Sequence, residues 1–233
     1  MITAEPKKGK YKRSADRLKN QHRDYKDRTV IGANDIAPIP DVVDIERRES
    51  TKFSFKLFCE IYHAKKFRLR WSHTHLNLIE TMERAVLDGG GNLAYACPRG
   101  FGKTSLAEVL AEWALFHAHK KYVMLVGATN SHALELASSI LTDIETNELY
   151  SEDFPEICYP VVHLEQQYIK AKTQHCNGVS TRIVYSKNKF VFPTIEGSPV
   201  SGSVFQCTSI TGRIRGAKYL SATGQSLRHD LVL

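Results

Sequence analysis

A glycine-rich stretch in the first half of the chain has the residue types that hold phosphate groups. Residues 97–104 read CPRGFGKT, in which Gly102, Lys103 and Thr104 match the end of the pattern G-x-x-x-x-G-K-[ST], while Cys97 replaces its first glycine. Gly100 lets the backbone curl so that successive N–H groups face an anion, and a helix after the loop would direct its N-terminus at the same place. The stretch predicts a phosphate site; the alternative is a plain glycine turn that caps a helix.

The side chains of this loop suggest a division of roles around ATP and Mg²⁺. Lys103 would neutralise the β- and γ-phosphates, and the Thr104 hydroxyl would ligate Mg²⁺. Arg99 adds a second cation that could bind or sense the γ-phosphate. We therefore expect Lys103 and Arg99 to be catalytic, and expect ATP to contact the whole loop: Pro98, Arg99, Gly100, Phe101, Gly102, Lys103, Thr104 and Ser105.

The segments on either side of the loop alternate between strand and helix patterns. The apolar run 92–97 predicts a buried strand, and 103–119 predicts a helix. A second buried strand is expected at 122–128 and a second helix at 131–147. This alternation is typical of an α/β fold with a largely parallel sheet flanked by helices.

Other elements are expected before and after this core. Helical spacing of apolar residues covers 50–67, and Ser72 or Thr74 can cap a further helix that the glycines at 89–91 end. After residue 155 the pattern changes to short strands: 181–186 and 189–193, joined by a tight turn, and then 203–210 and 228–233.

The charge of the chain is concentrated at its start. The 233 residues carry a formal charge of +7, and residues 1–28 hold ten Lys or Arg against four acids. We expect residues 1–34 to be a basic, disordered arm that attracts nucleic-acid phosphates or simply aids solubility, and residues 35–233 to form the phosphate-loop domain. No apolar run approaches 18 residues, which excludes a membrane-spanning helix. The five cysteines are scattered, which favours a reducing cytoplasm.

The loop and its flanks resemble a known family. The stretch PRGFGKTSLAEVLAEWAL resembles the variant loop of the large terminase subunit of tailed bacteriophages, which commonly reads P-R-G-x-G-K-[TS] and often lacks the first glycine. The resemblance extends over roughly residues 35–233, through FRLRWSHTHLNLIETMERAVLDGG, VMLVGATNSHALELASSILTDIETN and SGSVFQCTSITGRIRGAK. Near the end, His229 stands where the family has a proline.

This resemblance implies a viral DNA-packaging motor. It implies a RecA-like P-loop ATPase that couples ATP hydrolysis to movement of double-stranded DNA into a procapsid, in the cytoplasm of a bacterial host. It places Trp71 and His75 near the adenine, and Arg213 and Arg215 near nucleotide or DNA, although that arginine pair is equally typical of surface charge. The implied partners are the portal, the small terminase subunit and further copies of the chain in a ring.

The end of the given sequence bears on the activity that this resemblance implies. The resemblance places the acids that hold Mg²⁺ and orient water directly after Leu233, and Asp230 precedes that strand, so we expect a fragment without the nuclease domain that binds ATP weakly and hydrolyses it poorly. Another P-loop ATPase, such as a helicase or kinase, and a non-catalytic nucleic-acid-binding fragment remain alternatives. Two His-x-His pairs, at His73 and at His117, lack a nearby Cys or Asp partner and do not predict a metal site.

Overall fold

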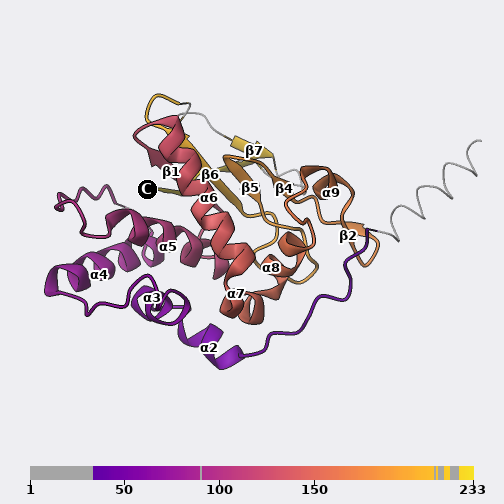
Figure 1. Ribbon diagram of the computed structural model, residues 1–233, viewed down its shortest axis with the longest axis horizontal. Helices are drawn as coiled ribbons and strands as arrows, with labels where there is room; N and C mark the ends of the chain where they lie inside the picture. The colour runs from indigo at the N-terminus through magenta and orange to yellow at the C-terminus, as the bar shows by residue number, and fades with distance from the viewer. Residues whose placement is uncertain (1–33, 90, 213, 215–217, 221–225) are drawn as a thin grey trace, which may run out of the picture.

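A mixed five-stranded sheet forms the centre of the molecule (Figure 1). The computed structural model describes residues 34–89, 91–212, 214, 218–220 and 226–233. In the sheet the strand order is β4-β5-β6-β1-β9, and the bounds are Val184–Tyr185 for β4, Lys189–Val191 for β5, Val204–Ser209 for β6, Tyr122–Gly127 for β1 and Leu231–Val232 for β9. β1 runs parallel to both β6 and β9, whereas β4, β5 and β6 pair antiparallel. The expected α/β class is confirmed, but the sheet is mixed rather than largely parallel.

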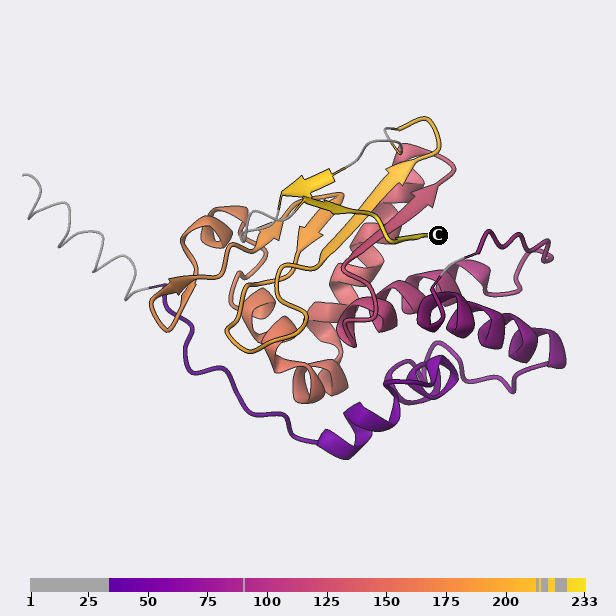
Figure 2. The same ribbon diagram turned by 180° about the vertical axis from the view of Figure 1, so that it is seen from behind.

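The alternation of side chains along β1 gives the sheet two apolar faces. Val123 and Leu125 point into the main core, while Tyr122 and Met124 belong to a smaller cluster on the opposite face. That second face carries a hairpin of β7 (Lys218–Leu220) and β8 (Ser226–Arg228), whose Tyr219 packs against the smaller cluster. Figure 2 looks onto this hairpin, with the helices behind the sheet. A third strand pair joins β2 (His175–Cys176) to β3 (Val179–Ser180).

Helices α5 (Lys103–Phe116) and α6 (Asn130–Thr146) pack against β1 and β6. α5 is buried on almost all sides from Leu106 to Phe116, so apolar residues lie around the whole helix rather than along one stripe, with Glu108 and Glu112 as buried exceptions. α6 begins at a Thr129 cap and buries the face that its 3.6-residue apolar spacing predicts. At Gly127, a Cβ would lie only 2.8 Å from the backbone N of Ala133, so the close approach of β1 to α6 requires glycine.

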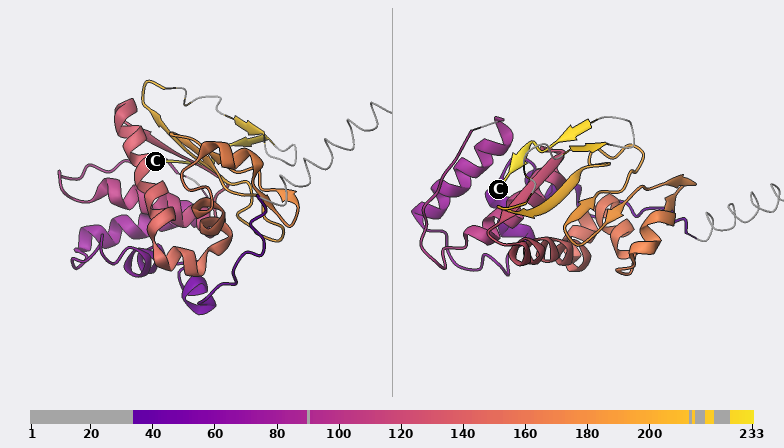
Figure 3. Two further views of the ribbon diagram at one scale, coloured as in Figure 1. Left: turned by 45° about the vertical axis from the view of Figure 1, so that its right-hand side comes forward. Right: turned by 90° about the horizontal axis from the view of Figure 1, so that it is seen from above.

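The remaining helices surround this centre, as the two views of Figure 3 show. Residues 34–44 run from β2 along the edge of the molecule to α2 (Ile45–Ser50), which leads into α3 (Phe55–Tyr62) and α4 (His73–Leu87). α4 begins at the predicted Ser72 cap and ends before Gly89, as expected. Three short helices follow α6, with bounds Glu148–Asp153 for α7, Pro155–Val162 for α8 and Tyr168–Thr173 for α9. In the described part of the chain, no helix is both long and apolar enough to cross a membrane.

The segment before the glycine-rich loop corrects the sequence-based expectation. Within the described residues, 92–97 form no strand; residues 92–96 are exposed, with Leu93 51% and Tyr95 44% accessible, and Cys97 is half-buried. β1 already has β6 and β9 as its two neighbours, so this run does not pair with it. The run also contains two alanines and an asparagine, which gain little from packing on a sheet. The apolar character of 92–97 was therefore insufficient to define a buried strand.

The expected basic arm at 1–34 lies outside the described residues except for Asn34.

The strands and the turn predicted for the second half of the chain are confirmed. β4 and β5 form a hairpin in which Ser186 N–H donates to the Lys189 carbonyl, β6 lies within 203–210, and β9 lies within 228–233. The apolar run 231–233 predicts a buried strand, but in β9 Leu231 is half-buried and Val232 is 45% exposed, because β9 is the outermost strand on its side of the sheet as described.

Candidate functional site

The glycine-rich loop (residues 97–104) turns directly into helix α5. Gly100 and Gly102 have φ angles of 80° and 83°, in the left-handed region that glycine adopts without strain. Gly102 is the residue that caps α5, and no side chain satisfies the first backbone N–H groups of that helix. A helix start of this kind leaves its N–H donors and the positive end of the helix dipole available to an anion.

Lys103 is the first residue of α5, and its side chain folds back over the loop. Its ammonium lies 3.1 Å from the Cys97 carbonyl and 3.2 Å from the Pro98 carbonyl, so it donates to two consecutive carbonyls at the start of the loop. Lys103 and Thr104 are both exposed, and a Cβ placed on Gly100 or Gly102 would meet no atom within 4 Å. The loop is therefore open on the side where a phosphate would approach.

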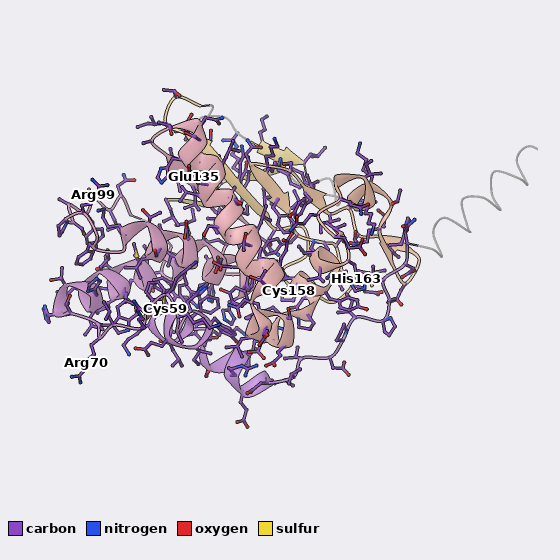
Figure 4. All side chains as sticks on the ribbon, viewed as in Figure 1. Cys59, Arg70, Arg99, Glu135, Cys158 and His163 are labelled. Carbon is purple, nitrogen blue, oxygen red and sulfur yellow. The ribbon has the colours of Figure 1, made fainter. Side chains whose placement is uncertain are left out.

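Arg99 occupies the exposed tip of the loop, and Figure 4 shows its side chain at the periphery of the molecule. Its position keeps the guanidinium in solvent rather than against the folded body. Arg213 and Arg215, the other two arginines expected near a ligand, lie outside the described residues.

Two sequence-predicted aromatic residues lie beside the loop. The His75 ring stacks on Phe101 with centroids 4.0 Å apart and planes 8° from parallel, and the Trp71 ring lies 5.9 Å from His75. His75 Nε2 is 3.1 Å from the Phe101 carbonyl, which only accepts, so Nε2 carries the proton. Its Nδ1 then accepts from the Ser72 backbone at the cap of α4. His75 thus ties the glycine-rich loop to the start of α4.

A cavity of about 200 Å³ lies between this aromatic group and the loop. Its wall combines Trp71, His75, Gly100, Phe101, Gly102 and Ser105 with residues that the sequence interpretation did not assign: Lys66, Phe67, Leu69, Arg70 and Leu106. The alternation of basic and large apolar side chains in 66–71 is the signal that could have identified them. The structure therefore brings Trp71, His75 and the loop together around one hollow.

The residues present fit ATP and Mg²⁺ only in part. The two left-handed glycines, Lys103 and the uncapped helix start suit a phosphate, and the exposed Thr104 hydroxyl suits one position on Mg²⁺. Asp230, the acid nearest to the strand β9, accepts hydrogen bonds from the backbone N–H groups of Lys121 and Tyr122 at 2.8 and 2.9 Å. Asp230 therefore stabilises the start of β1 and is not a second Mg²⁺ ligand.

A separate cluster with metal-ligand chemistry lies away from the loop. In the described part of the chain, one group of three potential metal ligands is found: His63, Glu112 and Asp143. One ligand atom of each of these side chains lies within 4.8 Å of the ligand atoms of the other two. One signal for this cluster was visible in the sequence: two glutamates four residues apart, Glu108 and Glu112, in an otherwise apolar stretch that forms the buried helix α5. The chain matches no family model, no curated protein and no solved structure.

Proposed function

We propose that the glycine-rich loop binds the phosphates of ATP and that the chain is the ATP-binding motor domain of a DNA-packaging terminase. In this proposal ATP hydrolysis is coupled to movement of double-stranded DNA into a procapsid, with a portal, a small terminase subunit and further copies of the chain as partners. The observation that carries the proposal is the pair of left-handed glycines that lead straight into the buried helix α5, with Lys103 as its first residue.

Lys103 and the start of α5 would hold the phosphates. The Lys103 ammonium would exchange its two carbonyl acceptors for phosphate oxygens, which carry more negative charge. Backbone N–H groups of the first turn of α5, including those of Thr104 and Ser105, would donate to the same anion. Bound Mg²⁺ would neutralise charge on the phosphates, and the Thr104 hydroxyl would supply one of its oxygen ligands.

The aromatic residues beside the loop would position the base. Trp71 offers an aromatic surface at the cavity, and its indole N–H is fixed by Glu60 at 2.8 Å. The stacked His75–Phe101 pair holds the loop against α4, so it sets the distance between the base and the phosphates. Arg99, which is exposed, is free to approach the γ-phosphate from solvent.

A nucleotide titration with a matched variant tests the phosphate assignment. Binding of ATP, ADP and AMP with Mg²⁺ is measured by calorimetry for the wild type and for Lys103→Ala. Loss of a charged phosphate contact predicts at least about tenfold weaker ATP binding, equivalent to about 1.4 kcal/mol, and a preference of the wild type for ATP over AMP. Lys172→Ala, an exposed lysine on α9, is the control and should bind like the wild type. Equal affinity in wild type and Lys103→Ala would refute the loop as a phosphate site.

DNA stimulation separates the terminase proposal from its alternatives. A motor domain that binds double-stranded DNA should hydrolyse ATP faster when DNA is added. Hydrolysis that does not respond to DNA favours a kinase-like or other P-loop ATPase. DNA binding that is independent of ATP and disappears when residues 1–28 are deleted favours a non-catalytic nucleic-acid-binding fragment.

A further inference from the structure

A buried polar cluster lies where α3, α5 and α6 meet. His63, at the end of α3, is 5% exposed, and Glu112, in the middle of α5, is 1% exposed. Asp143 on α6 completes a group in which each residue offers one ligand atom within 4.8 Å of the others. Burial of ionisable groups is costly unless each charge is paired, so each charged group in this cluster should have a partner of opposite charge.

The hydrogen bonds inside the cluster leave one buried oxygen without a partner. Glu112 Oε2 accepts from the Tyr150 hydroxyl at 2.6 Å and lies 2.7 Å from His63 Nε2. Among the residues that the structure describes, the other oxygen, Glu112 Oε1, has no hydrogen-bond partner, and it is fully buried. An orphaned carboxylate oxygen in such a place is unfavourable, and a cation is the ligand that would satisfy it.

Negative charge exceeds positive charge around this oxygen. Lys66 lies 2.6 Å from Asp143 and 3.8 Å from Glu108, and the charge of Glu112 also attracts its ammonium. The three carboxylates of Glu108, Glu112 and Asp143 thus face one lysine. Even if His63 carries a positive charge, the net charge of these five side chains is −1. Burial raises the pKa of Asp143, and the neighbouring charge of Glu112 raises it further.

The cluster is reachable from solvent. A cleft of about 410 Å³ is lined by His63, Lys66 and Asp143, together with residues at the start of α7. The Lys66 side chain is 29% exposed, so its ammonium stands between the buried acids and the cleft. A lysine has a long flexible stem, which lets it move into solvent without disturbing the backbone.

We propose that His63, Glu112 and Asp143 bind one divalent transition-metal ion of the Zn²⁺ class, and that Lys66 occupies the place of this cation in the metal-free protein. The donor set is one imidazole nitrogen and two carboxylate oxygens, which suits Zn²⁺ with a water from the cleft as fourth ligand. Metal binding releases the Nε2 proton that His63 shares with Glu112, and the Lys66 ammonium moves to solvent.

The geometry requires a small contraction. Bonds of about 2.0 Å to a tetrahedral ion place ligand atoms roughly 3.3 Å apart. The three ligand atoms now lie within 4.8 Å of one another, so the most widely separated of them must move closer together around the metal. His63 Nε2 and Glu112 Oε2 lie 2.7 Å apart, closer than this spacing, so these two atoms must separate slightly, whereas Asp143, at present held by Lys66, must move inward. Departure of Lys66 frees the Asp143 carboxylate for this movement. The Tyr150 hydroxyl, which lies 2.6 Å from both His63 Nε2 and Glu112 Oε2, gives up its contact with His63 Nε2 when the metal binds and keeps donating to Glu112.

Titration with Co²⁺ tests the proposal, because Co²⁺ replaces Zn²⁺ and has a visible spectrum that reports a four-coordinate site. The purified full chain is first stripped with a chelator and dialysed. We expect one equivalent of Co²⁺ to bind with this spectrum, Zn²⁺ to displace it, and Zn²⁺ to raise the melting temperature. Asp143→Asn, which keeps the side-chain shape, should weaken Co²⁺ binding by about tenfold or more.

A gain-of-binding variant keeps the proposal testable if other substitutions disturb the fold. Lys66→Met removes the competing ammonium and should strengthen Co²⁺ binding by about tenfold. His73→Gln is the matched control, because His73 is an exposed member of a His-x-His pair and should leave the spectrum unchanged. The proposal is overturned if neither the wild type nor folded Lys66→Met binds Co²⁺. It is equally overturned if His73→Gln, rather than Asp143→Asn, abolishes the site.

Discussion

At the residue scale, His117 is the clearest example of a titratable group whose behaviour the fold has changed. Its ring packs against Phe58 and Phe154, and Nε2 lies 3.1 Å from the Thr51 hydroxyl. Burial, assisted by repulsion from His119, Arg48 and Lys52, lowers the pKa of His117 from 6.5 to about 3. The folded protein therefore keeps this histidine neutral where an unfolded chain would protonate it.

Acid should destabilise the protein partly through this histidine. Between pH 6.5 and about 3 the unfolded state binds a proton that the folded state does not, so stability falls as pH decreases across that window. His117→Gln retains a donor for Thr51 and removes the titration, so the unfolding free energy should depend less on pH, by up to about 1.4 kcal/mol per pH unit. Urea unfolding at pH 4, 5, 6 and 7 measures this slope. An unchanged slope in His117→Gln would contradict the assignment, and exposed His73→Gln is the control for loss of a histidine.

The residue scale also shows how far the sequence could predict the candidate site. The glycines, Lys103 and the helix start were readable because their function is local and their spacing is short. The stacking of His75 on Phe101 depends on how α4 and the loop meet in space, which no local pattern specifies. The same holds for His63, Glu112 and Asp143, which come from three different helices.

At the scale of the elements, one ion-pair group fastens α2 to α7. The Arg47 guanidinium donates to Asp153 at 2.6 and 2.7 Å and to Glu152 at 2.6 Å. Asp153 is fully buried and also accepts from the Tyr62 hydroxyl at 2.6 Å. The burial of Asp153 makes Arg47 a necessary partner, since an unpaired carboxylate in that position would be strongly unfavourable.

Removal of Arg47 should therefore be costly. Arg47→Met leaves Asp153 buried with only Tyr62 as a side-chain donor, and we expect a loss of about 3 kcal/mol in the free energy of unfolding. Arg84→Met is the matched control, because the Arg84–Glu80 pair on α4 is exposed and such pairs contribute about 0–1 kcal/mol. Urea denaturation of the two variants measures these changes in the free energy of unfolding. Similar losses of stability in Arg47→Met and Arg84→Met would show that burial of Asp153 does not determine the cost of removing Arg47.

Prediction of the elements succeeded where a repeating pattern coincided with a capping residue. α4 has both an apolar face and the Ser72 cap, and α6 has both an apolar face and the Thr129 cap. The run 92–97 had only apolar composition, and strand formation also needs a partner edge that composition does not reveal. The short β7–β8 hairpin was not predicted, because its strands are three residues long and largely exposed.

At the scale of the whole molecule, burial is uneven around the loop. The helix after the loop lies in the main core, whereas every residue from 91 to 96 is exposed. In the described part of the chain, this segment has no regular secondary structure to protect its backbone. The same region therefore combines one of the most buried helices with a segment accessible to other macromolecules.

Limited proteolysis should detect this contrast. Chymotrypsin, which cuts after aromatic and large apolar residues, is expected to make its first cut within residues 34–233 at Leu93 or Tyr95. Mass spectrometry of early digests identifies the site, and Tyr95→Thr should slow cleavage there by several-fold. A first cut after Phe53 or Leu69, which are also exposed, would show that 92–97 is better protected than its structure indicates.

The burial of α5 also has a mechanical consequence. A helix enclosed by core residues from Leu106 to Phe116 is stiff, because close-packed interiors have low compressibility. If ATP binding at the loop drives movement, the displacement cannot come from a tilt or slide of α5. The compliant part must then lie ahead of Phe101, in residues 91–100, where every residue except Cys97 is exposed, because the His75–Phe101 stack ties Phe101 to α4. Force would then be generated on the solvent side of the loop and resisted by the helix behind it.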